Sequence, residues 1–565
     1  MEYKKLVEVY EKLESTTKKL EKRDILAKLF RETPDENLYQ IVLLSQGIVF
    51  PKFTGYELGM ATQMMIKAIS ISTGFTSTEV EEKFKETGDL GLTAEILIKN
   101  KKQVTLIKKT LTVLKVFTNL REVATTTGPG SQDRKIRLVA ELLNSAEPKE
   151  GKYIVRTILG ELRIGVAEGL IRDAIAYAFL IPKGVKEEDA IQAVDYAWNI
   201  LSDFGEVAVL CKEKGLEGLK NVKPVLGRPI QVMLGIKAES IEEVLKRHPV
   251  VIVEFKYDGM RMQIHKKGEK VWIFTRRLEE VTKQFPDVVE TVKNHVKAEE
   301  CIIEGEGWPI DKQTGKPLPF QKLSQRIQRK YDIERMAKEI PVQLNLFDIV
   351  YLNGEVLFNK PLKERIKLLE EIVEEVPMKI QIAERIISSD IKEIEEFYHK
   401  ALSLKQEGIM IKNPESPYIF GRHVGGWYKI KPTMETLDLV IVGAEWGEGS
   451  RAKWLSSYIL AVRDPDTGEF LTCGMMGTGL TEEQFQEMTE RLKPLIEREE
   501  GRVVWVRPEI VVEVSYQEIQ KSPKYTSGFA LRFPRLVRVR TDKGPEEADT
   551  IDRLKMLFES QGKFG

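Results

Sequence analysis

The sequence predicts a multidomain protein with three regions of different fold class. We expect an all-α region over residues 1–222, an α+β region over 223–432 and an OB-fold β-barrel over 433–565. The chain of 565 residues is longer than one hydrophobic core usually supports. Two changes in pattern set the boundaries: helical periodicity ends near Pro224 and Pro229, and a series of strand-like runs begins after Pro432.

Helical patterns fill most of residues 1–222. Near the N-terminus, apolar residues recur at the spacing of one helix face, at Tyr3, Leu6, Val7, Tyr10 and Leu13. Longer helical patterns cover residues 151–180 and 188–204, and a Gly/Pro/Thr-rich stretch at 125–132 interrupts them. Residues 1–222 are therefore predicted to be helical.

Short β-rich runs alternate with helical ones from about residue 230 to 432, which predicts the α+β region. After Pro432 come five strand-like runs, at 437–443, 457–463, 470–476, 503–506 and 510–514. A helical stretch at 481–498 falls between the third and fourth runs. Five strands with a helix at that place predict a small OB-type barrel.

Composition excludes several classes of protein. Lys plus Arg and Asp plus Glu both number 87, so a nucleic-acid-binding chain would need basic residues concentrated on particular faces. The three cysteines are isolated, which argues against a disulfide framework or a CxxC metal pair, and the five histidines form no ligand pattern. No apolar run approaches the roughly 18 residues of a membrane span, and the N-terminus lacks the apolar core of a signal peptide. We expect a cytoplasmic protein without membrane contacts.

The segment VVIVEFKYDGMRMQIH at residues 250–265 carries the main chemical signal. An apolar, β-branched run predicts a buried strand that ends at Lys256, with Glu254 on the same face as Lys256. Asp258-Gly259 is a turn signal, and the next strand places Arg261 opposite its apolar set. The turn therefore brings a lysine, an acid and an arginine together at strand ends. A KxDG tetrad alone arises by chance, so the order and spacing of further motifs carry the inference.

Other strands of residues 223–432 carry polar residues where a purely structural sheet would be apolar. Glu304 and Glu306 share a face in CIIEGEG, and VQLNLFD leaves Phe347 on the face with two amides, where it suits stacking on a purine. Trp272, Phe274 and Arg276 share a face in VWIFTRR, Glu407 precedes and Lys412 ends EGIMIK, and Trp427, Lys429 and Lys431 align in WYKIKP. Three lysines, two arginines and two acids facing one cleft would suit a nucleotide, its phosphates and a divalent cation.

In this order the motifs resemble the nucleotidyltransferase superfamily of ATP-dependent DNA ligases, especially the archaeal type that is similar to eukaryotic replicative ligases. EFKYDGMR resembles the nucleophile motif, and FTRRLEEVT, IEGEGW, LNLFDIVYLNG, QEGIMIK and GWYKIKP resemble the motifs that follow it. The C-terminal SPKYTSGFALRFPRLVRVRTDKGPEEADT resembles the barrel motif that closes on the nucleotide. TTTGPGSQDRK and KYIVRTILGELRIG resemble the DNA-binding domain of these ligases. The resemblance covers nearly the whole chain.

The resemblance implies an N-terminal DNA-binding domain, an adenylation domain and an OB-fold domain, with ATP and Mg²⁺ as cofactors and nicked duplex DNA as substrate in replication, repair and recombination. Lys256 would be the nucleophile that carries AMP. Glu254 would accept a hydrogen bond from the adenine amino group and Phe347 would stack on adenine. The remaining implied roles are Arg261 and Glu306 at the ribose and reactive centre, Arg276 and Lys429 on the nucleotide, Lys431 near the phosphates, Glu306 and Glu407 at the metal, and Arg538, Asp542 and Lys543 at the triphosphate.

One position departs from the family pattern. The family usually places an arginine six residues before the first lysine of the WxKxK motif, but His423 stands there, with Arg422 one place earlier. Either Arg422 supplies the contact from a shifted loop or the contact is weaker.

The implied chemistry explains the residue types. A lysine amine attacks the α-phosphorus of ATP only in its neutral form, whereas an ordinary lysine is protonated at neutral pH. Arg261, Lys429, Lys431 and Mg²⁺ are the neighbours expected to favour the neutral amine and to stabilise charge on phosphorus. Because the barrel must present different faces in self-adenylation and in DNA joining, we expect rotation about residues 432–435.

The sequence allows two interpretations of several residues outside the motifs. Lys152, Arg156, Arg163 and Arg172 are interpreted either as DNA contacts or as members of ion pairs within the helical region. The segment from Gln103 to Ile107 is either a sliding-clamp peptide or a solvent-facing turn before a helix. We expect a monomer.

The sequence leaves two alternative functions to consider. An RNA ligase or a GTP-using capping guanylyltransferase shares the lysine motif, but the long helical N-terminus and the RFPR-to-DKG segment argue against it. A non-catalytic DNA-binding protein with an inactive nucleotidyltransferase fold is opposed by the intact Lys256, Arg261, Glu306 and Lys429.

Overall fold

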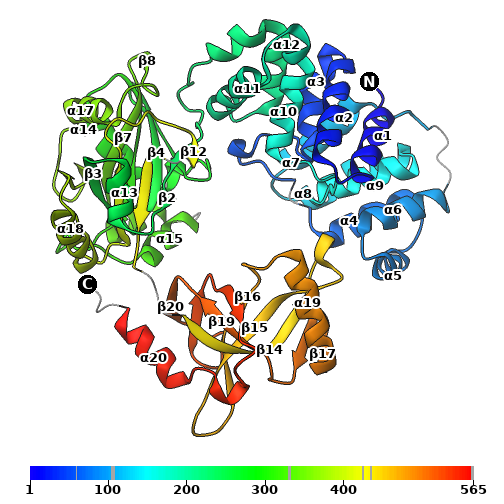
Figure 1. The fold of residues 1–565 in the computed structure, drawn as a ribbon. Coiled ribbons are helices and arrows are strands. Elements are labelled where there is room, and N and C mark those ends of the chain that lie inside the picture. Colours follow the sequence, from blue (N-terminus) through cyan, green and yellow to red (C-terminus); the bar gives the residue numbers. More distant parts are fainter. Residues whose placement is uncertain (59, 104–107, 329–331, 423–424, 433–435, 562–565) are drawn as a thin grey trace. The chain divides into compact units, whose positions relative to one another are not determined.

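The computed structural model describes residues 1–58, 60–103, 108–328, 332–422, 425–432 and 436–561 (Figure 1). The chain forms two compact units. The first consists of Met1–Glu395 and Ile409–Ile430, and the second consists of Glu396–Gly408 and Lys431–Gly565. We refer to residues 1–222, 223–432 and 433–565 as the helical, central and C-terminal regions. No helix in the described part of the chain is both long and apolar enough to cross a bilayer.

The helical region is all-α, as the periodicity predicts. Its helices are α1 (Tyr3–Glu14), α2 (Lys19–Glu32), α3 (Asp35–Ser45), α4 (Thr62–Thr73), α5 (Ser77–Thr87), α6 (Leu90–Lys99), α7 (Val113–Thr125), α8 (Ser131–Ser145), α9 (Pro148–Ile158), α10 (Glu168–Phe179), α11 (Glu187–Leu201) and α12 (Phe204–Lys220).

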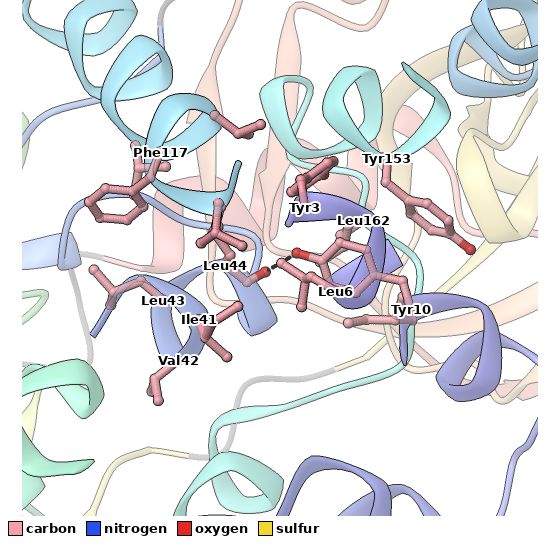
Figure 2. Packing of buried hydrophobic residues seen from close by; sticks show 14 of the residues in the cluster. Tyr3, Leu6, Tyr10, Ile41, Val42, Leu43, Leu44, Phe117, Tyr153 and Leu162 are labelled. Atoms are coloured by element: carbon pink, nitrogen blue, oxygen red, sulfur yellow. Dashed lines mark hydrogen bonds between the residues drawn. The ribbon is translucent and has the colours of Figure 1, made fainter. Parts of the chain in front are cut away.

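The first helix shows how the sequence pattern becomes packing. The five residues predicted to share one face are the five that α1 buries. Tyr10 enters the core of the region, where its hydroxyl donates a hydrogen bond of 2.7 Å to the carbonyl of Leu44 on α3 (Figure 2). The buried hydroxyl is therefore paired, as burial requires.

Two sheets form the core of the central region. The five-stranded sheet has the order β10 (Arg385–Ser388), β3 (Val251–Lys256), β11 (Gly408–Lys412), β13 (Trp427–Ile430) and β2 (Ile236–Lys237). The six-stranded sheet has the path β5 (Lys270–Thr275), β4 (Met260–Lys267), β6 (Glu300–Pro309), β7 (Val342–Leu352) and β8 (Glu355–Val356), and β9 (Ile380–Ile382) pairs with β7. A short pair joins β1 (Met233–Leu234) to β12 (Gly421–Arg422).

The two faces of the six-stranded sheet differ in chemistry. One face carries Met262, Ile264 and Ile303, which belong to an apolar cluster with residues of the helices α14 (Pro286–His295) and α17 (Leu362–Ile372). Because side chains alternate along a strand, the neighbours of these residues point the other way. Several of those neighbours are polar yet buried, as is Asn345 between Leu344 and Leu346 of the same cluster; we call Gln263, His265, Glu304 and Asn345 the polar layer.

The polar layer anchors the segment that enters the central region. Gln263 forms two hydrogen bonds of 2.9 Å with the backbone N–H and C=O of Ile230. Nδ1 of His265 accepts from the N–H of Gly227 at 3.1 Å, and its Nε2 pairs with Gln263 Oε1 at 2.9 Å. Burial lowers the pKa of His265 to about 3, so the ring is neutral at physiological pH.

Four further helices complete the central region: α13 (Ile241–Arg247), α15 (Phe320–Gln328), α16 (Ile333–Glu339) and α18 (Ile391–Ser403).

The C-terminal region is rich in strands and OB-like, as predicted. Its elements are β14 (Leu437–Trp446), β15 (Leu455–Arg463), β16 (Phe470–Met476), α19 (Glu482–Leu492), β17 (Ile496–Glu500), β18 (Val503–Val506), β19 (Val511–Ser515), β20 (Glu518–Lys521), β21 (Phe529–Arg532), β22 (Arg535–Val539) and α20 (Ile551–Ser560). All five expected strand runs are strands, and α19 lies between the third and fourth of them. The structure adds β17, β20, β21 and β22 and the C-terminal helix.

Candidate active site

Lys256 lies where the chain passes from one sheet of the central region to the other. It is the last residue of β3 in the five-stranded sheet, and β4 of the six-stranded sheet begins four residues later. Its side chain is half-buried. The predicted strand–turn–strand arrangement around this lysine is therefore present.

Gly259 allows the turn after Lys256 to lie against β6. A Cβ atom on Gly259 would stand 2.3 Å from the carbonyl oxygen of Gly307 and 3.1 Å from Cγ of Glu306. Real Cβ atoms do not approach a carbonyl oxygen this closely, so the close approach requires glycine. It also brings Glu306, which is half-buried, beside the turn.

Arg261 is held inside the central region by a fixed set of acceptors. Its Nε and one Nη donate to the same carboxylate oxygen of Glu304 at 2.9 and 2.6 Å, and the other Nη donates to the carbonyl of Met233 at 2.6 Å. Tyr418 donates its hydroxyl to the second oxygen of Glu304. Arg261 is thus oriented by a fully buried carboxylate.

Glu254 pairs with Lys412 across the five-stranded sheet. The distance from Lys412 Nζ to Glu254 Oε2 is 2.5 Å, and both side chains are almost fully buried. Burial raises the pKa of Glu254, and the ammonium of Lys412 opposes that rise. An ionised carboxylate can only accept hydrogen bonds. This is the property expected of a group that binds the amino group of a ligand.

Phe347 lies in an aromatic corner that also holds Lys412. The ammonium of Lys412 stands 4.3 Å from the centre of the Phe347 ring and 4.1 Å from that of Trp427. The two rings meet edge to face at 5.8 Å. Phe347 is half-buried, so part of its surface is accessible to a flat ligand.

Glu306 is fixed by its neighbours on both sides of β6. It pairs in register with Arg261 on β4 and with Asn345 on β7. Asn345 donates from Nδ2 to the carbonyl of Glu306 at 3.3 Å, while its Oδ1 accepts from the amides of Gln343 and Gln381 at 3.0 and 2.7 Å. Amides on the predicted polar face thus support the strand that carries Glu306.

The two lysines of the WYKIKP segment lie in different surroundings. Lys429 on β13 pairs in register with Met410 on β11 and is half-buried. Lys431 is more exposed and forms an ion pair of 2.9 Å with Glu407. Lys431, an expected phosphate contact, and Glu407, an expected metal ligand, therefore form an ion pair with each other.

Arg276 differs from the expectation drawn from strand alternation. β5 ends at Thr275, so Arg276 lies beyond the strand and is exposed. It lines a surface hollow with Arg277, Lys52 and Phe53. Phe274 is buried and packs edge to face on His265 at 5.1 Å. The predicted shared face therefore does not extend to Arg276, because the strand ends one residue before it.

Several expected residues fall where the structure gives no side-chain description. His423, the side chain of Arg422, Val104–Ile107 of the clamp segment and residues 433–435 of the expected hinge lie outside the described residues.

The four basic residues considered as DNA contacts in the helical region all have carboxylate partners. Lys152 pairs with Glu11 at 3.1 Å, and Arg156 pairs with Asp89 at 2.7 Å and with Glu14 at 3.0 Å. Lys152 and Arg156 are buried, so for these two the ion-pair alternative describes the structure. The half-exposed pair forms similar contacts: Arg163 with Asp89 at 3.0 Å, and Arg172 with Asp173 at 2.9 Å.

The C-terminal residues expected to act on the triphosphate are paired within their own region. Arg538 Nε lies 2.6 Å from Glu513, and Lys543 Nζ lies 2.7 Å from Asp438. Asp542 accepts two hydrogen bonds from Arg540 at 2.9 and 2.8 Å.

Sequence reasoning did not assign the residues that hold the site in shape. Glu304 and Lys412 were noticed as charged residues in strands, but their pairing with Arg261 and Glu254 was not predicted. Tyr418 could not be found, since it belongs to a segment without periodicity and reaches Glu304 from 114 residues away in sequence.

Two sheets joined at a lysine-bearing turn, lined by acids and cations and followed by an OB-like barrel, define the class of covalent nucleotidyltransferases. Known proteins place the chain more closely. Residues 2–176 match the family described as DNA ligase N terminus, residues 232–431 the ATP dependent DNA ligase domain, and residues 451–543 the ATP dependent DNA ligase C terminal region.

Full-length relatives agree with these matches. The chain is 52% identical to a DNA ligase of Nanoarchaeum equitans over 99% of both chains. It is 46% identical to a DNA ligase of Thermococcus onnurineus over 100% of this chain and 99% of that one. A solved structure named Pmar-Lig_PreS3 covers 95% of this chain and 99% of its own, with a TM-score of 0.60 and 18% identity, a likeness in fold alone. The chain belongs to the ATP-dependent DNA ligases of the archaeal type.

Proposed function

We propose that this ligase seals nicks in duplex DNA through an AMP carried on Nζ of Lys256. The observation that carries the proposal is the position of Lys256 at the turn between the two sheets, with Glu306 beside that turn. The RNA ligase and guanylyltransferase alternatives gain no support from family membership.

The reaction has three steps. Lys256 Nζ attacks the α-phosphorus of ATP, a nitrogen–phosphorus bond forms and pyrophosphate leaves. The 5′-phosphate of the nick then attacks the same phosphorus, which frees the lysine and leaves AMP on the DNA. Finally the 3′-hydroxyl attacks the activated 5′-phosphate, the phosphodiester forms and AMP leaves with the electron pair of the broken bond.

We assign the adenine end of the site to Glu254 and Phe347. Glu254 accepts from the adenine amino group, and Lys412 favours the charged form of this carboxylate by lying 2.5 Å from it. Phe347 offers its accessible face for stacking. Because Lys412 already lies over one face of the ring, adenine takes the remaining accessible surface or displaces the ammonium.

Arg261 and the lysines serve the ribose and phosphates. The carboxylate of Glu304 fixes Arg261 before any ligand arrives, so little rotamer entropy is lost on binding. Lys429 and Lys431 neutralise charge on the transferring phosphate, and Lys431 must exchange Glu407 for phosphate to do so. Arg276 and Arg422 are proposed to contact the nucleotide.

The carboxylates present fit Mg²⁺ bound jointly with substrate. Mg²⁺ is usually bound by one or two carboxylates and shares phosphate oxygens, and Glu306 and Glu407 supply hard oxygen ligands. Among the described residues no group of three or more His, Cys, Asp or Glu side chains could hold a metal ion, which suits a shared ion better than a closed structural site. When bound, Mg²⁺ would supply positive charge at the α-phosphate.

We assign three functional domains: residues 1–222 to DNA binding, 223–432 to adenylation and 433–565 to closure on the nucleotide. The family matches at 2–176, 232–431 and 451–543 support this division. Arg538, Asp542 and Lys543 orient the triphosphate, and rotation near residues 432–435 separates this step from DNA joining. The domains serve replication, repair and recombination in a monomer.

A sliding clamp is a second partner proposed for the segment Gln103–Ile107. The paired hydrophobic residues Leu106 and Ile107 are the anchors of such a peptide. The test is capture by a clamp of the wild type and of the Leu106→Ala/Ile107→Ala double variant. Equal capture of both would contradict the assignment.

Mass spectrometry after exposure to ATP and Mg²⁺ tests the central claim. We expect one AMP on the wild type, none on Lys256→Ala, and no sealing of a nicked duplex by that variant. Lys267→Ala, at the exposed far end of β4, is the matched control and should carry one AMP. Normal nick sealing by Lys256→Ala would overturn the proposal.

A further inference from the structure

Two carboxylates face each other across adjacent strands of the C-terminal region. Asp438 on β14 pairs in register with Glu513 on β19, and Glu513 pairs in register with Arg538 on β22. Side chains directly opposite each other on antiparallel strands lie on the same face about 4.5–5.5 Å apart, and like charges there are destabilising. The Asp438–Glu513 pair therefore needs cations beside it.

The needed cations come from the segment Arg538–Lys543, which is the closure motif of the proposed function. Arg538 Nε lies 2.6 Å from Glu513, Lys543 Nζ lies 2.7 Å from Asp438, and Arg540 Nη1 lies 3.4 Å from Asp438. Thr436 adds a hydrogen bond of 2.8 Å from its hydroxyl to Glu513. Two carboxylates thus hold three cations of one short segment.

The members of this contact differ in side-chain exposure. The carboxylates expose 14% and 16% of their side chains and Arg540 exposes 14%, whereas Arg538 exposes 61% and Lys543 31%. Long exposed cationic side chains reorient readily, and their ion pairs with surface carboxylates are weak. Arg538 and Lys543 can therefore leave while Arg540 and the carboxylates stay in place.

We propose that Asp438 and Glu513 are counter-ions that occupy the closure-motif cations when no triphosphate is bound and compete with the triphosphate for them. The inference rests on the proposed role of Arg538 and Lys543 at the triphosphate. The two carboxylates touch neither substrate nor reacting atoms; they position the cations. Departure of Arg538 and Lys543 leaves two facing negative charges with only Arg540 beside them, so return to the paired state is favoured once pyrophosphate has left.

The test is the ATP dependence of enzyme–AMP formation in the full-length Glu513→Gln and Asp438→Asn variants. Removal of one competitor lowers the KM for ATP about two- to fivefold, the range expected for one exposed ion pair. The maximal rate stays unchanged. Inhibition of the same step by inorganic pyrophosphate strengthens by a similar factor. Sealing of a nick that already carries AMP, which needs no triphosphate, stays within about twofold of wild type.

Controls separate competition from other effects. Glu487→Gln removes one negative charge from the same region, where it pairs with Arg491 on α19, and should leave the KM for ATP unchanged. A raised KM in Glu513→Gln and Asp438→Asn would show that the carboxylates pre-orient the cations for ATP, and an unchanged KM would show that they are only structural. Either result overturns the inference. Absence of an AMP adduct on the wild type would instead overturn the proposed function.

Discussion

The central and C-terminal regions both pair carboxylates with cations, but they bury these pairs to different extents. In the central region Glu304 exposes 0% and Arg261 13% of the side chain, and Lys412 and Glu254 expose 2% and 4%. In the C-terminal region Glu513 pairs with a cation that is mostly exposed. Loss of one partner of a buried pair leaves an uncompensated charge, whereas an exposed partner is replaced by water. The buried pairs therefore fix a shape, and the exposed pairs can exchange.

The largest expected effect is the loss of Glu304. Glu304→Gln leaves Arg261 without its charged partner in the protein interior, and we expect the free energy of unfolding to fall by about 3–5 kcal/mol. Urea unfolding followed by circular dichroism measures this change. Glu374→Gln, which removes an exposed carboxylate of the same region, is the control. A loss below about 1 kcal/mol in Glu304→Gln would remove the distinction between the two regions.

The next effect concerns the turn after Lys256. Gly259→Ala places a methyl group 2.3 Å from the carbonyl oxygen of Gly307, so the turn must move and Lys256 with it. We expect enzyme–AMP formation to slow by about 100-fold, as a displacement near 1 Å commonly does. Gly169→Ala, where a Cβ meets no atom within 4 Å, should react like wild type. A wild-type rate in Gly259→Ala would show that the close approach is unimportant.

An acid-dependent loss of stability is expected from the polar layer. The unfolded chain takes up a proton on His265 near its ordinary pKa of about 6.5, but the folded chain does so only near 3. The stabilisation is complete above pH 6.5 and declines as the pH falls toward 3. His265 should account for about 2–3 kcal/mol of the stability lost between pH 7 and 4.5. The free energy of unfolding of His265→Gln should lack this pH-dependent loss, whereas that of the control His399→Gln, at an exposed position, should show it. The same pH dependence in His265→Gln and wild type would contradict the assignment.

The smallest effect is expected on the exposed side of the comparison. Glu513→Gln should change the free energy of unfolding by less than about 1 kcal/mol, because an exposed ion pair is lost while repulsion with Asp438 is relieved. The change should shrink further at high salt. A loss of several kcal/mol would mean that this pair is as structural as those of the central region.

Much of the fold followed from periodicity in the sequence. The buried face of α1, the five expected strands of the C-terminal region and the turn at Lys256 are present where the pattern put them. Each depends on residues close together in sequence, where the spacing of apolar side chains determines which face is buried.

Features that depend on distant residues were not predictable in this way. Tyr418 reaches Glu304 from a segment without periodicity. Phe274 and Arg276 were expected to share one face of a strand, but the strand ends at Thr275, and Phe274 packs on His265. Strand alternation tells which face a side chain is on, not whether a ligand or another side chain covers that face.

The hydrogen bonds of Gln263 to Ile230 have a practical consequence for dividing the protein. Ile230 and Met233 share an apolar cluster with Ile200 of α11 and Phe358, so the expected boundary at residue 222 cuts through packed side chains. A polypeptide that ends at residue 222 would uncover Ile200 to water, and self-association of the fragment would follow. A fragment that extends to about residue 234 keeps Ile230 and Met233 packed against the helices. Ile230 then lacks its hydrogen-bond partner Gln263.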